Sequence, residues 1–224
     1  MNIKITQEIH DYLYKNSKWQ SYTFGSQLHG IATENSDLDL IYIYELKDSF
    51  NTIAKYYPNI HSLQYDAKEI NVQAVWMTTE QFYQNLFSGD GNMCADIVIL
   101  NSNFKANALY YCYTYKVIKG YLGVAKRDLK LHAQDPKKRF HAARSLMFAE
   151  YLMQQKLPTK HDIQNLYKKE LKDKEYYWEK EAMLRDELNV LLYLAQINMY
   201  PAVTELNPVH QLIAEANNIR EFKY

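Results

Sequence analysis

The spacing of hydrophobic residues changes about halfway along the chain. In the first half, short apolar or alternating runs predict strands, the last two joined as a hairpin, at residues 21–24, 38–44, 61–66 and 69–77. Apolar residues at helical spacing predict a helix over residues 5–14, and residues 78–81 resemble a cap that begins a helix through Phe87. In the second half the helical period dominates, which predicts helices at 106–133, 137–156, 160–171, 175–198 and 207–217.

This pattern predicts an α+β fold, in which a small mixed β-sheet with flanking helices is followed by an all-helical C-terminal domain. The polar stretch Asn101-Ser102-Asn103 separates the two patterns. We therefore expect one domain over residues 1–103 and a helical domain over residues 104–224. With 224 residues and 47% hydrophobic content, the chain is long enough for one large domain or for two small ones that share a cleft.

Residues 25–40 combine a Gly-Ser turn with two aspartates one residue apart. Gly25 lets the backbone approach a ligand closely, and the exposed N–H groups of the helix that follows favour a phosphate there. Ser26 adds a hydroxyl donor. Asp37 and Asp39 stand at positions i and i+2 of a predicted strand, so both carboxylates leave the same face. Carboxylates beside a phosphate are typical ligands of Mg²⁺, which predicts magnesium-dependent phosphoryl chemistry.

The string from Gly25 to Asp39, Gly-Ser-Gln-Leu-His-Gly-Ile-Ala-Thr-Glu-Asn-Ser-Asp-Leu-Asp, resembles the signature of the polymerase-beta-type nucleotidyltransferase superfamily. It resembles in particular the predicted nucleotidyltransferases of phages and bacteria, some of which are associated with RNA repair. The resemblance implies transfer of a nucleoside monophosphate from an NTP, with Mg²⁺ or Mn²⁺ at Asp37 and Asp39 and the donor's phosphates at Gly25 and Ser26. It also implies a nucleotidyltransferase-like fold, with a palm-like sheet and a helical domain that completes the nucleotide cleft.

A second group of polar residues lies on a predicted helix of the second half. Lys137, His141 and Arg144 are spaced i, i+4 and i+7, so they share one face of a helix that is apolar over most of its circumference. Basic side chains on such a face are unfavourable unless they reach a cleft or an anion. We expect Arg144 to bind the triphosphate as a bidentate fork, Lys137 as a point charge, and His141 to orient or donate to a phosphate.

Charge is unevenly distributed along the chain, although its total is balanced. The sequence has 26 Lys plus Arg and 26 Asp plus Glu, so overall charge does not predict a nucleic-acid partner. Between residues 116 and 144, however, nine basic residues stand against two acidic ones. Such a patch can bind the phosphates of an NTP or of a nucleic-acid backbone, or it can be an ordinary solvated helix face.

The third acidic residue of the resembled family is where this chain departs from the pattern. A later strand normally supplies a carboxylate that accepts the proton of the acceptor hydroxyl, and the position that aligns with it here is Asn71. Glu69 lies one side-chain repeat away on the same strand face, so its longer side chain can take this role or point into solvent. We include Glu69 with Asp37 and Asp39 as catalytic candidates. Because Asn71 is uncharged, the sequence supports binding of nucleotide and magnesium more strongly than it supports catalytic turnover.

Together these features predict an enzyme, a magnesium-dependent nucleotidyltransferase that transfers an NMP from an NTP to an acceptor hydroxyl. The acceptor is an RNA 3′ end, a protein side chain or a small molecule. A nucleotide- or RNA-binding module with weak or no catalysis is an alternative, and Asn71 is its main support. A toxin–antitoxin-type nucleotidyltransferase that modifies RNA or protein is also open.

Other features bear on location and partners. No apolar run is long enough to span a membrane and the N-terminus lacks a signal-peptide pattern, so we expect a cytoplasmic protein, in the host cytoplasm if a phage encodes it. Cys94 and Cys112 have no metal-binding spacing, so we expect neither a disulfide nor a zinc site. The expected partners are therefore an NTP and an RNA or protein acceptor, with no membrane.

Overall fold

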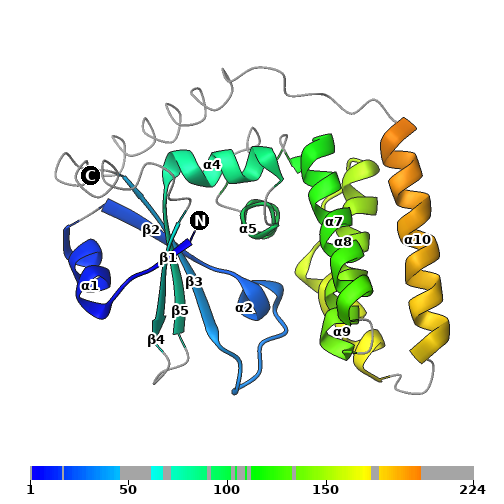
Figure 1. The fold of residues 1–224 in the computed structure, drawn as a ribbon, viewed down its shortest axis with the longest axis horizontal. Helices are drawn as coiled ribbons and strands as arrows, with labels where there is room; N and C mark the ends of the chain where they lie inside the picture. The colour runs from blue at the N-terminus through cyan, green and yellow to red at the C-terminus, as the bar shows by residue number, and fades with distance from the viewer. Residues whose placement is uncertain are drawn as a thin grey trace.

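The computed structural model describes residues 2–16, 18–45, 62–67, 72–89, 92–101, 104, 109, 112–132, 135–172 and 177–197. Its centre is a five-stranded sheet with the order β1-β4-β5-β3-β2 (Figure 1). The strands are β1 (Asn2–Lys4), β2 (Lys18–Thr23), β3 (Leu38–Glu45), β4 (Ser62–Ala67) and β5 (Val72–Thr78). The β3 strand pairs antiparallel with β2 and parallel with β5, β4 pairs antiparallel with β5, and β1 pairs parallel with β4. The chain is therefore an α+β protein with a small mixed sheet, as the sequence predicts.

Helices lie on both faces of this sheet and form the second half of the described chain (Figure 1). Those of the first half are α1 (Gln7–Asn16), α2 (Gly25–His29), α4 (Thr79–Ser88) and α5 (Met93–Leu100). Those of the second half are α7 (Tyr115–His132), α8 (Pro136–Met153), α9 (Lys160–Lys172) and α10 (Tyr177–Ile197). The α8 helix packs against α7, α9 and α10, which explains why it is apolar over most of its circumference.

The alternation of side chains along β3 decides which of its residues face the helical half. Tyr42 and Tyr44 belong to a small cluster on the α1 side of the sheet. Ile41 and Ile43 point the opposite way, into the large core that also contains residues of α5, α7 and α8. Because side chains alternate along a strand, Asp39 shares the face of Ile41 and Ile43. The sequence of β3 thus directs Asp39 toward the second-half helices.

Local sequence explains where two of the helices begin, α4 and the pocket-lining α8. Thr78 caps α4, since its hydroxyl accepts a hydrogen bond of 3.1 Å from the Gln81 backbone N–H. The Asp135 carboxylate likewise accepts from the Lys137 N–H at 2.8 Å, and Pro136 occupies the first position of α8. The cap places Lys137 in the first turn of α8, with His141 and Arg144 one and two turns further along the same face.

Most of the predicted elements are confirmed, with shifted ends. The predicted helix over residues 5–14 is α1, two residues later, and the predicted hairpin is formed by β4 and β5. The short strand β1 was not predicted, because three residues carry too little pattern. A continuous helix over 106–133 is wrong, since Tyr113 and Thr114 form a turn before α7. The predicted helix 207–217 and the domain boundary at 103 lie outside the described residues.

Cys94 and Cys112, the two cysteines of the chain, are buried free thiols. Among the described helices, none is both long enough and apolar enough to cross a membrane.

Candidate functional site

The Gly-Ser turn after β2 lies directly against the second aspartate of the motif. Gly25 has a φ angle of +60°, in the left-handed region that favours glycine. A Cβ atom added to Gly25 would lie 2.2 Å from Oδ2 of Asp39. The backbone conformation therefore favours glycine here, and a side chain at this position would displace the Asp39 carboxylate, which packs against the turn.

Gly25→Ala is expected to lower the free energy of unfolding by about 1–3 kcal/mol, because alanine strains the turn and its methyl group displaces Asp39. Gly123→Ala is a matched control, since no atom lies within 4 Å of a Cβ at this position in α7. The control should be neutral or stabilising by up to about 1 kcal/mol, because alanine is the better helix former. Urea unfolding measures both variants, and equal stability of Gly25→Ala and the wild type would contradict the close approach.

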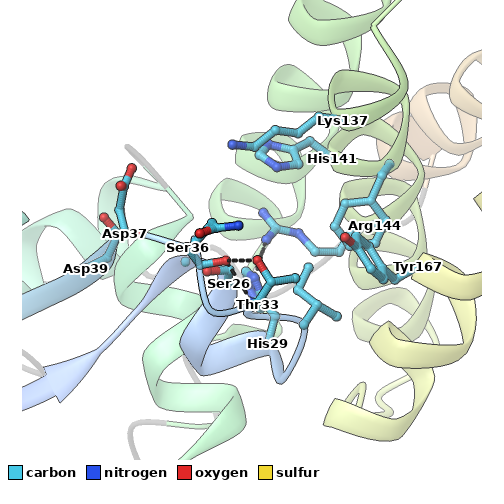
Figure 2. A pocket seen from close by; sticks show the side chains of 14 residues that line it. Ser26, His29, Thr33, Ser36, Asp37, Asp39, Lys137, His141, Arg144 and Tyr167 are labelled. Carbon is cyan, nitrogen blue, oxygen red and sulfur yellow. Dashed lines mark hydrogen bonds between the residues drawn. The ribbon is translucent and has the colours of Figure 1, made fainter. Parts of the chain in front are cut away.

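Asp37 and Asp39 lie on one side of a pocket, at the beginning of β3 (Figure 2). Asp37 is exposed and Asp39 is half-buried. Burial and the negative charge of Asp37 raise the pKa of Asp39, while the positive charge of Lys137 lowers it. Two carboxylates that repel each other in this way favour a bound cation, because the cation removes the repulsion.

The third catalytic candidate does not belong to the described part of the chain. Glu69 and Asn71 immediately precede β5 in the sequence and lie outside the described residues. Within the described residues, no group of three or more His, Cys, Asp or Glu side chains is arranged to hold a metal ion. Asp37 and Asp39 nevertheless fit Mg²⁺, which commonly takes one or two protein carboxylates and completes its octahedron with water and substrate phosphates.

The other wall of the pocket is basic and comes from α8. Lys137, His141 and Arg144 all line the pocket, and Figure 2 shows them across from the two aspartates. Burial and the nearby charge of Arg144 lower the pKa of His141 to about 4, so this imidazole is neutral at pH 7. His141 can therefore donate one hydrogen bond to a phosphate, but the positive charge of this wall comes from Lys137 and Arg144.

Between the two walls, the pocket is lined by small polar side chains. Ser26 lies there together with Thr33 and Ser36 of the α2–β3 connection (Figure 2). The Ser36 hydroxyl accepts a hydrogen bond from the Thr33 backbone N–H at 2.8 Å, and the Ser36 N–H donates to the Thr33 carbonyl at 3.0 Å. This turn holds the connection in a fixed shape just before Asp37.

The pocket has a volume of about 380 Å³, which lies in the range typical of small-molecule sites. Besides the residues already named, it is lined by His29, Ile31, Asn35, Phe140 and Tyr167. It therefore brings together all the candidates from the sequence that the structure describes, namely Gly25, Ser26, Asp37, Asp39, Lys137, His141 and Arg144.

A buried polar network holds Arg144 from behind. Asp96 of α5 is 4% exposed, and its carboxylate accepts a hydrogen bond of 2.6 Å from the Tyr121 hydroxyl. The other carboxylate oxygen lies 3.0 Å from His29 Nε2 and 3.7 Å from Arg144 Nη2. Arg144 Nη1 also lies 2.8 Å from His29 Nδ1 and 2.9 Å from His29 Nε2. Arg144 is thus not a free bidentate fork, because part of its guanidinium already contacts His29.

The contacts in this network shift the pKa values of His29 and Asp96. Burial and the charge of Arg144 lower the pKa of His29, although the hydrogen bond to Asp96 opposes them. A neutral His29 with its proton on Nε2 can donate to Asp96 while Nδ1 accepts from Arg144. Burial raises the pKa of Asp96, but the charge of Arg144 and the hydrogen bonds from His29 and Tyr121 outweigh it and lower the pKa overall. The network therefore pairs one carboxylate with one guanidinium.

Sequence reasoning missed His29, Asp96 and Tyr121 as a group, and it also missed Tyr167. One signal was present: Asp96 is the only charged residue in α5, whose other seven residues are apolar. A lone carboxylate in a buried helix needs a partner, so it points to a polar network. The sequence gives no sign that the partners come from α2, α7 and α8.

Comparisons with known proteins do not identify a family: no family model matches the chain, and no curated protein matches it.

Proposed function

We propose that this protein is a magnesium-dependent nucleotidyltransferase, which transfers a nucleoside monophosphate from an NTP to an acceptor hydroxyl. The supporting observation is a single pocket with a pair of carboxylates on one wall and two cationic side chains on the other, with serine hydroxyls between them. A metal-bound triphosphate has the matching charges, since its metal end needs oxygen ligands and its phosphate chain needs cations. The nucleotidyltransferase-like fold and a cytoplasmic location belong to the same proposal.

In this proposal, Asp37 and Asp39 hold Mg²⁺, or Mn²⁺ in its place. The metal, when bound, offsets the charge of the triphosphate and makes the acceptor hydroxyl easier to deprotonate. Gly25 leaves room for the Asp39 carboxylate against the turn, and Ser26 donates its hydroxyl to a phosphate oxygen. These residues fix the α-phosphate beside the carboxylates, where the acceptor hydroxyl can reach it.

Lys137 and Arg144 neutralise the phosphates that leave. The acceptor oxygen forms a bond to the α-phosphorus, the bond from that phosphorus to the bridging oxygen breaks, and pyrophosphate carries away the electron pair. Negative charge therefore develops on the leaving group, opposite the basic wall. The acceptor's proton passes to a base, for which Glu69 is the candidate from the sequence, or to solvent.

Incubation with each labelled NTP, Mg²⁺ or Mn²⁺, and pooled RNA tests the proposal directly. Label transferred to RNA supports action on an RNA acceptor, while label on protein supports modification of a side chain. Metal-dependent NTP binding without any transfer would contradict the enzyme assignment and would favour the nucleotide-binding module.

Lys137→Ala is expected to weaken NTP binding about tenfold, equivalent to about 1.4 kcal/mol, because it removes one charge-assisted contact. Lys138→Ala is a matched control, since the adjacent lysine does not line the pocket. Isothermal titration calorimetry in the presence of Mg²⁺ measures both affinities. If both variants bind NTP as the wild type does, Lys137 does not contact the triphosphate.

A further inference from the structure

The exposed face of α7 is almost entirely basic. Every α7 residue that the structure gives as exposed is a lysine, an arginine or a glycine, namely Lys116, Lys119, Gly123, Lys126, Arg127 and Lys130. The lysines follow one another at helical spacing, so they form one stripe along the helix. From Lys116 to Lys130 the stripe is about 21 Å long at 1.5 Å per residue.

The four lysines of this stripe are not neutralised within the described part of the chain. No ion pair joins any of them to a carboxylate there, whereas Arg127 Nε lies 2.9 Å from Asp128 Oδ1. Lys119 is placed over the ring of Tyr115, with Nζ 5.8 Å from the ring centroid. The stripe thus concentrates uncompensated positive charge on a protein whose total charge is balanced.

We propose that the lysine stripe of α7 binds the phosphodiester backbone of a nucleic-acid strand. Successive phosphates of one strand are about 3.4 Å apart along a duplex and further apart in an extended single strand, so the stripe is long enough to meet several of them. Lysines act as flexible point charges, which suit a row of phosphates. A single planar anion is bound better by the forked guanidinium of arginine. Gly123 has no side chain, and no atom lies within 4 Å of the position that a Cβ would take there, so the middle of the stripe is open to the strand.

The apolar residues of α7 argue for nucleic acid over an anionic membrane. A helix that binds a membrane surface inserts an apolar face. Here Val117, Ile118 and Leu122 of α7 are buried in the core. Among the described residues, the exposed large hydrophobic side chains lie on α1 and α10.

The stripe ends near the pocket. The α7 and α8 helices are consecutive and lie side by side (Figure 1), so the C-terminal end of α7 lies by the N-terminal end of α8. Asp128 of α7 is buried on the face turned away from the stripe, and it raises the pKa of His141 against the other influences on it. The use of a bound strand as the acceptor rests on the proposed function, whereas its binding to the stripe does not.

The test measures binding of fluorescent single-stranded RNA and DNA of equal length by anisotropy, without NTP, between about 50 and 200 mM salt. Four backbone contacts give a slope of log affinity against log salt of about −2.8, which corresponds to about 50-fold weaker binding over this range. The variant K116A/K119A/K126A/K130A should lose this slope and bind weakly at every salt concentration. The control variant K15A/K156A/K168A/K169A removes four other exposed lysines and should keep the wild-type slope.

The comparison of RNA with DNA identifies the preferred nucleic acid, because the stripe should bind that strand more tightly. Equal binding by the stripe variant, the control variant and the wild type would overturn the proposal. The proposal would also be overturned if the stripe bound anionic vesicles or an acidic peptide but bound neither RNA nor DNA. NTP affinity, measured separately, should stay unchanged in the stripe variant. A wild-type protein that binds strands through the stripe but binds no NTP would refute the proposed function and leave this inference standing.

Discussion

Replacing both Asp37 and Asp39 with asparagine should abolish nucleotidyl transfer and leave the fold intact. The asparagine amides keep the size of the side chains but remove the two charges that hold the metal. Loss of metal-based charge stabilisation of several kcal/mol corresponds to a fall in rate of about a thousandfold or more. The labelled-NTP transfer assay measures this fall.

The structure also predicts the direction in which this double substitution changes stability. The pKa of Asp39 is raised by burial and by Asp37, so the folded protein disfavours its charged form at neutral pH. A neutral asparagine should therefore leave the melting temperature unchanged or slightly higher. Asp66→Asn is the control for a lost carboxylate on the same sheet, because Asp66 pairs with Lys4 on β1, away from the pocket. Transfer that persists in the double variant, or that is lost equally in the control, would refute the metal assignment.

Asp96→Asn should destabilise the protein by about 3–5 kcal/mol, the typical effect of removing one partner of a buried ion pair. The amide has the shape of the carboxyl group, but it leaves the guanidinium of Arg144 without its counter-charge. Tyr121→Phe should have a smaller effect of about 1.5–3 kcal/mol, since it removes one hydrogen bond to a charged group. Urea unfolding measures both variants.

A double variant tests whether the pair, rather than Asp96 alone, accounts for this effect. Asp96→Asn combined with Arg144→Met removes both charges, so its destabilisation should be smaller than the sum of the two single effects. The contribution of Asp96 to the free energy of unfolding should be fully present above the ordinary carboxyl pKa of 3.8. It should be lost as the pH falls through the lower pKa that Asp96 has in the folded protein. Strict additivity of the two substitutions would show that Asp96 and Arg144 are not coupled.

Patterns within a few residues of one another were readable from the sequence. The i, i+2 spacing predicted Asp37 and Asp39 on one side at the start of β3, and the i, i+4, i+7 spacing predicted Lys137, His141 and Arg144 on one side of a helix. Both follow from backbone geometry, which fixes side-chain direction over one or two turns whatever the rest of the chain does. The Thr78 cap and the start of α4 belong to the same class of local information.

The pocket itself depends on contacts that no local pattern encodes. Gly25 was a candidate because it follows a strand, but only the packed structure shows that Asp39 occupies the space of its absent Cβ. The network behind Arg144 joins His29 to Asp96 across 67 residues and to Arg144 across 115. From the sequence, Asp96 indicates only that a buried carboxylate needs a partner, not which residues supply it.

The sequence by itself determined two groups of charged residues, one acidic at the start of β3 and one basic on α8, because each group is set by the short-range geometry of its own segment. The tertiary structure decided that these two groups face each other and that Arg144 is held by Asp96 and His29. It also decided that the lysines of α7 remain on the surface while the rest of that helix enters the core. These facts depend on how the sheet packs against the helical half, and such packing minimises exposed apolar area over the whole chain rather than over any one segment.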